Sequence, residues 1–388
     1  MLEVYAQPID RSVFVAGETI ECRIVFINAN TGIKQRTKSV QLAWASAQIH
    51  CQCTTNESRI SIPKSEPTSA DLSSSANETS FVPSRGEKGQ AVLTSKPTIL
   101  FCDLALKSGE RREFIYKESI PLDAPPSYRG NSIKYAYKIT IGTQQLNKPT
   151  ELLRVSFRVL VVPGLNDLTV YADPDSLTPS NPFRKQQKNK ETAPTGILDI
   201  ALQIIQNLTC RRTTNFYNIT NSNGKVARFC LFKQAFRIGD DIIGTFDFSL
   251  GTIPCIKMAV SLQSEEQVSA ECRKKNTSNS SITTHCRQQL FCLHSLHTHI
   301  TIPVPLTATP EFFTDLVHLK WKLHFEFVVC SDTVDVNALC GLTSLTEYET
   351  WKAPECLQVE TMIWDLPVKI LATNPVSCPP HSTSVGYG

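Results

Sequence analysis

Apolar and polar residues alternate with a period of two along much of this chain. Near the start, Ile20, Cys22 and Ile24 fall on one face of an extended strand, and Glu21 and Arg23 fall on the other. The same alternation recurs in residues 133–141, 153–161, 317–327 and 362–370. A strand with one apolar and one polar face is typical of antiparallel sheets that pack against each other as a sandwich. The pattern therefore predicts an all-β fold.

The second half of the chain repeats the strand order of the first. Each half begins with a strand, a turn that joins a glycine to an acidic residue, and a second strand, with Gly17-Glu18 in one turn and Gly239-Asp240 in the other. In each half a segment with proline and aromatic residues then precedes a long alternating strand, at residues 125–128 and 310–313. We therefore expect two antiparallel β-sandwich domains of one design in tandem. Such an arrangement favours a scaffold or binding protein.

Changes in composition divide the chain into a first sandwich, a flexible linker, a second sandwich and a tail, expected at residues 1–163, 164–209, 210–372 and 373–388. Residues 61–80 are rich in Ser and Thr and have too few apolar residues to pack, which predicts a mobile loop. Within the linker, apolar residues recur at helical spacing over 197–208, which predicts a short helix that leads into the second domain. The Pro-, Ser- and Gly-rich tail is expected to be disordered.

Composition and charge narrow the class of protein. Hydrophobic residues make up 41% of the 388 residues, which is enough for packed cores, and the net charge of +3 is too small to favour nucleic-acid binding. No apolar stretch has the length of a membrane-spanning helix, and Met1–Pro8 lacks the basic and apolar segments of a secretory signal. We therefore expect a cytosolic protein whose 14 cysteines are reduced thiols.

The segment around residues 285–299 is the densest candidate for metal binding. Its potential ligands are His285, Cys286, Cys292, His294, His297 and His299. If the segment is extended, His297 and His299 share one strand face and Cys292 and His294 share another, so these four are the candidate ligands. Zinc sites need about four converging ligands, and the segment has neither a CxxC pair nor the spacing of a zinc finger. We therefore expect a polar strand face here and no metal centre.

Other conspicuous groups are interpreted as structural. Cys51 and Cys53 would lie on one strand face, whereas a redox-active cysteine pair would sit at a helix N-terminus, so we expect two small buried side chains. Asp240 and Asp241 are expected to be solvated turn residues. The basic run at residues 184–190 lies in the linker and is expected to be solvated, because a single cluster of this size binds membranes weakly.

The chain lacks the common motifs for nucleotide binding and hydrolysis. It contains no P-loop, no GxGxxG that opens a helix and no GxSxG. We expect no catalytic residue and no cofactor, so the function should depend on surfaces. The outward faces of two long alternating strands carry the candidate partner-binding residues, which are Lys134, Lys138, Lys320, Lys322 and His324.

Longer blocks of sequence carry a resemblance to a known family. The tandem sandwich, with its glycine-acidic turns and its proline-aromatic segments, resembles the arrestin fold. Five blocks narrow the resemblance, at residues 42–52, 99–104, 126–130, 319–327 and 364–371. On these blocks the chain resembles the Rgp family of retrograde Golgi transport proteins, from about Val4 to Leu371.

The resemblance implies a role that composition does not reveal. Rgp proteins pair with a much larger subunit, Ric, and the complex is the guanine-nucleotide exchange factor for the Golgi Rab-six GTPase. The resemblance therefore implies a cytosolic protein that is recruited peripherally to Golgi membranes and serves endosome-to-Golgi and intra-Golgi retrograde traffic. It implies no catalytic residue in this chain.

Two other functions remain open at this point. An arrestin-like trafficking adaptor would act without Ric. Many adaptors of that kind carry a PPxY motif, whereas residues 379–382 of this chain read Pro-Pro-His-Ser. A metal-dependent enzyme would use the His- and Cys-rich segment, and zinc analysis of the purified protein would test that idea.

Overall fold

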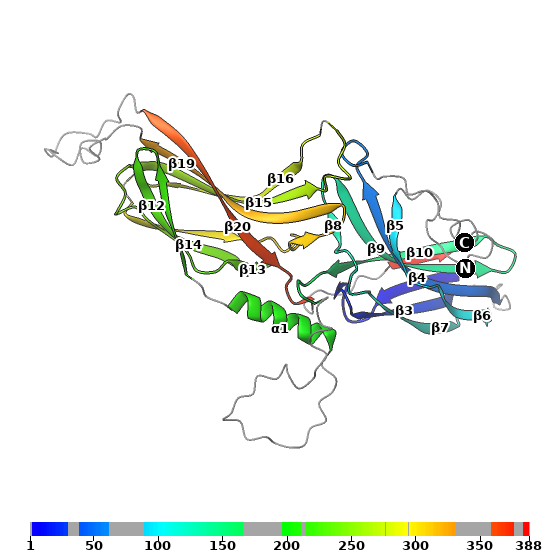
Figure 1. Cartoon of the computed structure of the whole chain (residues 1–388). Coiled ribbons are helices and arrows are strands. Elements are labelled where there is room, and N and C mark those ends of the chain that lie inside the picture. The colour runs from blue at the N-terminus through cyan, green and yellow to red at the C-terminus, as the bar shows by residue number, and fades with distance from the viewer. Residues whose placement is uncertain are drawn as a thin grey trace, which may run out of the picture.

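The structure is a computed structural model that describes residues 2–29, 39–61, 89–165, 196–210, 214–275, 277–293, 295–330, 358–375 and 383–387. Most of the loop predicted at 61–80 lies outside these residues, and so does the basic run at 184–190. The described residues form two β-sandwich domains and one helix (Figure 1).

Ten strands of the first half form the first domain. They are β1 (Leu2–Pro8), β2 (Val13–Val15), β3 (Thr19–Asn28), β4 (Val40–Thr55), β5 (Gln90–Thr94), β6 (Thr98–Leu106), β7 (Arg111–Ser119), β8 (Tyr128–Arg129), β9 (Ile133–Gln145) and β10 (Thr150–Leu160). One sheet has the order β21-β1-β3-β7, where β21 (Thr383–Tyr387) comes from far along the chain. The other has the order β2-β10-β9-β4-β5, with β6 paired to β4 and β8 paired to β9.

The second domain repeats this layout. Its strands are β11 (Asn215–Asn221), β12 (Gly224–Leu231), β13 (Ala235–Arg237), β14 (Asp241–Asp247), β15 (Cys255–Val268), β16 (Ser280–Phe291), β17 (His297–Pro303), β18 (Phe312–Phe313), β19 (Val317–Cys330) and β20 (Val359–Leu371). One sheet has the order β11-β12-β14-β17 and the other β13-β20-β19-β15-β16, with β18 paired to β19. In both domains a short parallel pair, β2 with β10 and β13 with β20, stands among antiparallel strands. The prediction of an all-β fold with two tandem sandwiches is confirmed.

The glycines of the two repeated turns have matching geometry. Gly17 has a φ of 93° and Gly239 a φ of 87°, a region that glycine adopts readily and other residues avoid. The N–H of Gly17 donates to the carbonyl of Ile120 at 3.0 Å, and the N–H of Gly239 donates to the carbonyl of Val304 at 3.0 Å. The turns therefore tie equivalent segments of the two domains.

The acidic residue of each turn also has the same role. The Glu18 carboxylate accepts a hydrogen bond of 2.6 Å from the N–H of Val15, and the Asp240 carboxylate accepts one of 3.1 Å from the N–H of Arg237. Each carboxylate thus satisfies a backbone donor that the turn would leave unpaired. Asp240 is therefore a turn-stabilising residue, whereas Asp241 is exposed, as expected.

The predicted alternation matches the observed burial on the long strand β19. Trp321, Leu323, Phe325 and Phe327 are buried in the core between the sheets of the second domain, and Leu319 is buried where the strand meets the first domain. Strand β9 of the first domain shows the same alternation, with buried Ile133, Tyr135, Tyr137, Ile139 and Ile141.

Strand β4 departs from this alternation, because both of its faces are covered. Its outward-facing residues Gln48 and His50 are as buried as the inward-facing Cys51 and Cys53. On this face the Gln48 amide donates to the carbonyl of Ser95 at 2.7 Å, whereas the buried Ser46 hydroxyl has no hydrogen-bond partner among the described residues. Burial raises the pKa of the Cys51 thiol to about 12 and that of Cys53 to about 11. Both thiols are therefore protonated at neutral pH, in agreement with a structural role.

A buried carboxylate joins the two domains. Glu266, on β15 of the second domain, is 3% exposed and accepts hydrogen bonds of 2.8 Å from the backbone N–H groups of Asn131 and Ser132 in the first domain. The hydroxyl of Tyr128 also hydrogen-bonds to Glu266. A buried carboxylate is costly without such partners, so this contact fixes the β8–β9 turn against β15.

Aromatic and apolar contacts extend this junction. The rings of Tyr128 and Phe312 meet edge to face, 4.9 Å apart between centroids, and the guanidinium of Arg158 donates to the carbonyl of Ala308 at 2.7 Å. Residues of the second domain complete the core of the first, namely Val268, Cys272, Phe312, Val317 and Leu319. The two sandwiches therefore share a continuous core at their contact.

Helix α1 (Ile197–Cys210) lies alongside the junction of the two domains (Figure 1), over the segment where helical spacing predicts a helix. Its buried residues Ala201 and Ile205 pack with Val15, Leu160 and Leu165 of the first domain. Among the described residues, no helix has the length and apolar character needed to cross a membrane.

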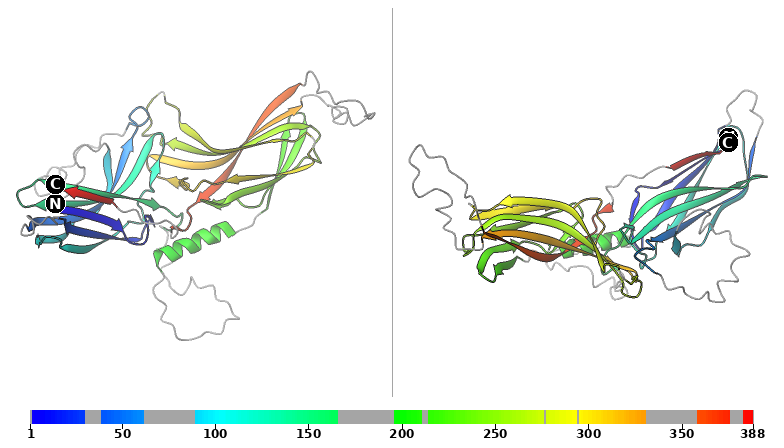
Figure 2. Two further views of the ribbon diagram at one scale, coloured as in Figure 1. Left: turned by 180° about the vertical axis from the view of Figure 1, so that it is seen from behind. Right: turned by 90° about the horizontal axis from the view of Figure 1, so that it is seen from above.

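Strand β21 lies where a disordered tail is predicted. It pairs antiparallel with β1, opposite Leu2–Ala6, and Figure 2 shows the two strands side by side at the ends marked N and C. Strand β11 holds the same position beside β12 in the second domain. The prediction was wrong for Thr383–Tyr387, because the strand is stabilised by a partner at the opposite end of the sequence.

Candidate interaction surfaces

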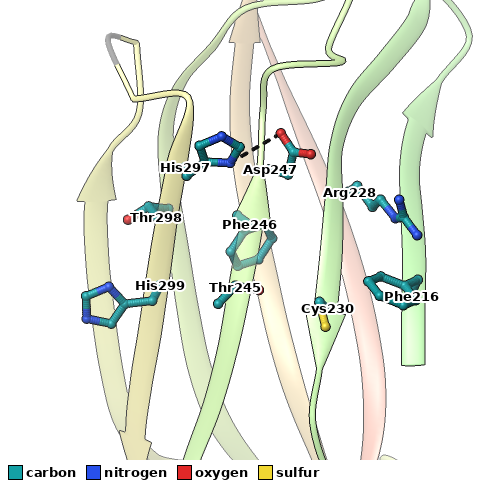
Figure 3. A pocket seen from close by; sticks show the side chains of 9 residues that line it. All are labelled: Phe216, Arg228, Cys230, Thr245, Phe246, Asp247, His297, Thr298 and His299. Atoms are coloured by element: carbon teal, nitrogen blue, oxygen red, sulfur yellow. Dashed lines mark ion pairs between the residues drawn. The ribbon is translucent and has the colours of Figure 1, made fainter. Parts of the chain in front are cut away.

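The outward face of the sheet β11-β12-β14-β17 carries an open hollow of about 490 Å³ (Figure 3). Every second residue of a strand faces the same way, so neighbouring strands contribute side chains to one surface. Strand register arranges these side chains in two rows, one of Phe216, Cys230, Thr245 and His299 and one of Arg228, Asp247 and His297. Residues far apart in the sequence thus form one continuous face.

Two contacts organise this hollow. The guanidinium carbon of Arg228 lies 4.0 Å from the ring centroid of Phe216, a cation–π contact that orients both side chains. On the other side, Nδ1 of His297 lies 3.5 Å from a carboxylate oxygen of Asp247. Figure 3 marks this ion pair with a dashed line. The hollow therefore has an aromatic and cationic end and an acidic and imidazole end.

Asp247 is held as a carboxylate. Its Oδ1 accepts hydrogen bonds from the hydroxyl of Ser249 at 2.5 Å and from the N–H of Ser249 at 2.9 Å. These two bonds, with the nearby charge of His297, lower the pKa of the Asp247 carboxyl despite some desolvation. The hollow thus combines fixed charges of both signs with an exposed ring, a mixture suited to recognising another protein surface.

The structure separates the side chains considered as metal ligands. His297 and His299 share the outward face of β17, as predicted, whereas Cys292 is 2% exposed and lies in the core of the second domain. His294 lies outside the described residues. Within the described ranges, no three His, Cys, Asp or Glu side chains come together in a group that could hold a metal ion.

His285, from the same segment, packs against the neighbouring strands. Its ring centroid lies 4.6 Å from that of Trp321, and its Nε2 lies 2.8 Å from the hydroxyl of Ser264. Desolvation lowers the pKa of His285 below its ordinary value, so the ring is neutral at neutral pH. Its role is therefore explained by packing and one hydrogen bond.

The candidate partner-binding residues of the second domain form an ion-pair network on β19 and β20. Lys322 Nζ and His324 Nδ1 each lie 2.6 Å from an oxygen of Asp365. Desolvation raises the pKa of Asp365, but hydrogen bonds from Lys322 and His324 outweigh it, and the pKa lies below its ordinary value. With Lys320 on the same face and His324 also near Glu326, this surface is charge-balanced rather than strongly basic.

Lys134 and Lys138 lie on β9, the strand of the first domain that corresponds to β19. Register places Lys134 opposite Thr54 and Lys138 opposite His50 of β4. Lys134 is exposed, and Lys138 is half-buried. Partner binding by these lysines, and by the cations of β19, stays a prediction.

The hollow on β11-β12-β14-β17 could hardly be predicted from the sequence. Phe216, Arg228 and Asp247 lie on three strands, and only the sheet register brings them together. One local signal was available: an aspartate two residues before Ser249 is typical of a turn in which the carboxylate binds the backbone.

Comparison with known proteins adds a family context to this geometry. The model of the Rgp1 family matches residues 65–169 and 164–330. The human protein named RAB6A-GEF complex partner protein 2 is 40% identical over 397 residues, which cover 99% of this chain and 99% of that protein. The Bos taurus protein of the same name is 40% identical over 378 residues, which cover 95% of this chain and 93% of that protein. The sequence similarity to these proteins therefore covers both β-sandwich domains.

Proposed function

This chain belongs to the Rgp1 family, and on that premise we propose that it is a recognition subunit of a guanine-nucleotide exchange complex that activates a Rab GTPase. One observation carries the proposal: 40% identity, across 99% of the chain, with a protein named as a partner in a RAB6A-GEF complex. The two sandwiches joined through Glu266 give such a subunit a body with wide outward sheet faces.

The finer parts of the proposal rest on the resemblance to Rgp proteins. The GTPase is of the Rab-six type at the Golgi, and the other subunit is the large Ric protein. The complex acts on the cytosolic side of Golgi membranes, to which it is recruited peripherally. There it serves endosome-to-Golgi and intra-Golgi retrograde vesicle traffic.

Nucleotide exchange explains how a protein without a catalytic side chain could act. An exchange factor breaks no covalent bond; it binds the nucleotide-free GTPase more tightly than the loaded form and so promotes release. In this proposal the chain supplies a binding surface and is not an enzyme by itself. The arrestin-like form of the two sandwiches is part of the same proposal.

Open sheet edges offer one way to bind a partner. Among the described strands, β11 pairs only with β12, and β16 stands at the end of its sheet beside β15. An extended segment of the GTPase or of Ric could add to such an edge as a further strand. Lysine at the exposed positions Phe216 and Asn218 of β11 should hinder such pairing.

The matched control for this edge is Ile243→Lys, an exposed position on β14 in the interior of the same sheet. We expect the variant with Phe216→Lys and Asn218→Lys to reduce binding to Ric or nucleotide release, with no such effect from the control. Unchanged Ric binding and unchanged exchange in the β11 variant would remove the edge-pairing idea.

The main experiment is reconstitution of exchange. The chain is purified alone and together with the large subunit, and release of a fluorescent guanine nucleotide from the Rab is measured. We expect rapid release with the two subunits together and none above background with the chain alone. Full activity of the isolated chain would overturn its assignment as a non-catalytic subunit.

An arrestin-like trafficking adaptor is the second candidate, because tandem sandwiches fit that role as well. The same purification separates the two. A chain that forms no complex with the large subunit and does not affect exchange in its presence would favour the adaptor.

A further inference from the structure

A second hollow, of about 480 Å³, lies where the two domains meet. The first domain contributes Leu122, Pro125 and Pro126 from the connection between β7 and β8, and Val161 and Pro163 from the segment that follows β10. The second domain contributes the β18–β19 hairpin, from Glu311 to Leu316. The site therefore exists only when the domains are docked as described.

The hairpin presents an aromatic side chain at this place. Phe312 and Phe313 are adjacent on β18, so they face opposite ways; Phe312 is buried against Tyr128, while Phe313 is 75% exposed. The hairpin is held by a hydrogen bond of 2.9 Å from the N–H of Thr314 to the carbonyl of Val317. A hydrogen bond of 3.3 Å from the Tyr135 hydroxyl to Thr314 ties it to the first domain. Phe313 is thus an exposed ring on a braced support.

Phe313 stands between two hollows. Another hollow, of about 430 Å³, lies next to the hollow of 480 Å³ and shares Pro163, Glu311, Phe312 and Phe313 with it. This neighbouring hollow is also lined by Leu208 of α1 and Leu371 of β20. We call the two hollows on either side of Phe313 the interdomain cleft. Apolar surface around an exposed ring is typical of a protein-binding site, where aromatic residues contribute much of the affinity.

The hollow of about 480 Å³ within the cleft is lined by acidic side chains. Asp123, Glu311 and Asp315 line it, and among the described residues no Lys or Arg does. In the part of the chain that the structure describes, Asp123 and Asp315 are exposed and have no ion-pair partner. Glu311 lies 3.8 Å from His318, but desolvation and the charge of Lys320 lower the pKa of His318, so this imidazole is a weak counter-charge.

We propose that the interdomain cleft binds an extended segment of a partner protein in which a large apolar side chain stands beside Lys or Arg. The apolar side chain packs on Phe313 and the prolines, and the cations face Asp123 and Asp315. Opposite charges around an apolar centre give such a segment both affinity and orientation. The inference goes beyond the exchange role, because it assigns a peptide site to this chain in whichever complex the chain serves.

Binding of two synthetic peptides to the full chain tests the proposal. One short fluorescent peptide alternates Lys or Arg with Leu around a central Phe, and its match has Glu in place of each Lys and Arg. Fluorescence anisotropy should show at least about tenfold tighter binding of the basic peptide. Equal affinities, or no binding of either peptide, would overturn the proposal.

Variants at exposed positions locate the binding. Phe313→Ser should weaken binding of the basic peptide about tenfold, because it removes the central ring. The matched control is Phe291→Ser, at a ring that is 76% exposed on β16 outside the cleft, and it should leave affinity unchanged. Equal losses in both variants, or none in Phe313→Ser, would contradict the assignment.

The charges are tested in the same way. Asp123→Asn with Asp315→Asn should weaken binding of the basic peptide several-fold and flatten its dependence on salt. Glu271→Gln with Glu360→Gln removes two exposed carboxylates elsewhere and should change neither. An unchanged salt dependence in the first pair would remove the role of the acids. Nucleotide exchange is measured on these variants as a separate readout. If the cleft does not bind the basic peptide, the exchange proposal is still decided by the reconstitution experiment.

Discussion

The carboxylate of Glu266 in the second domain accepts a hydrogen bond of 2.8 Å from the backbone N–H of Ser132 in the first, and both residues are buried. The same carboxylate serves Asn131 and Tyr128, so one side chain satisfies three donors from the opposite domain. Because burial strengthens hydrogen bonds to a charge and penalises their loss, this residue should dominate the docking of the domains.

Replacing Glu266 by Leu should destabilise the chain strongly. The N–H of the buried Ser132 would be left without an acceptor and that of Asn131 would lose its partner, at a cost of about 2–5 kcal/mol in free energy of unfolding. Chemical denaturation measures the loss. Glu266→Gln keeps one acceptor oxygen and should cost less, and the exposed Glu271→Gln should cost nothing measurable. Stability equal to that of the unaltered chain in Glu266→Leu would contradict this account.

The two repeated turns should respond unequally to alanine. Both Gly17→Ala and Gly239→Ala impose a positive φ on a residue with a Cβ, at a cost of about 1–2 kcal/mol. At Gly17 the new Cβ would also lie 2.5 Å from Leu122 Cδ2 and 3.2 Å from Ile197 Cγ2. At Gly239 the one described side chain that it would meet is the exposed Leu306, at 2.9 Å. Thermal unfolding should therefore show a larger loss for Gly17→Ala.

Gly109→Ala is the control for this comparison, because Gly109 has a φ of 76° and no atom of the described residues lies within 4 Å of an added Cβ. It should show the backbone strain alone. If Gly109→Ala and Gly17→Ala lower the unfolding temperature equally, the crowding by Leu122 has no weight.

His285 should make stability depend on pH near neutrality. Its folded pKa is lowered by desolvation from an ordinary value of 6.5, so protonation favours the unfolded chain. The contribution of the neutral ring is complete above that ordinary value and is lost as the pH falls through the folded pKa. Because the ring is partly exposed, the loss should be below about 1 kcal/mol.

Unfolding midpoints compared at mildly acidic and mildly alkaline pH measure this effect. His285→Gln should flatten the pH dependence, while His299→Gln, at an exposed position on β17, should leave it as it is. A pH dependence that persists unchanged in His285→Gln would assign the effect to other groups.

Removal of β21 should loosen the first domain. A chain that ends at Pro375 lacks the strand paired with Leu2–Ala6 and leaves the edge of β1 open. The lost backbone hydrogen bonds are partly offset by the regained chain entropy, so we expect a loss of about 1–2 kcal/mol. Hydrogen exchange should rise in β1 and stay constant in β12, whose partner β11 remains. Unchanged protection of β1 would show that the pairing does not form in solution.

The purified chain should hold zinc well below one ion per molecule. Cys292 is buried in the core, away from the outward-facing His297 and His299, so these side chains do not converge. Elemental analysis after removal of loosely bound metal measures the content. One zinc per chain that is lost in the variant with His297→Ala and His299→Ala would reinstate a metal site.

Alternation predicted much of the fold because each strand carries its own pattern. The buried series on β19, from Leu319 to Phe327, follows directly from its period-two apolar residues, and the repeated turns at Gly17 and Gly239 follow from the glycine-acidic pairs. Such signals depend only on residues that are close in the sequence, so they can be recognised in a single sequence.

Contacts between distant residues could not be predicted in the same way. Glu266 shares a strand face with the apolar residues Leu262 and Val268, a pattern that indicates a buried position. The N–H groups that make this burial possible, however, belong to a turn in the other domain. The covered outward face of β4 and the row formed by Arg228 and Asp247 depend likewise on neighbours that only the fold supplies.

The place of β21 ties the completion of the first domain to the order of synthesis. This strand follows every other described element along the chain, yet it closes the sheet that begins with β1. During translation the whole second domain is therefore synthesised before the strand that completes the sheet of the first domain. Until β21 has been made, the backbone of Leu2–Ala6 lacks the strand that pairs with it in the folded protein.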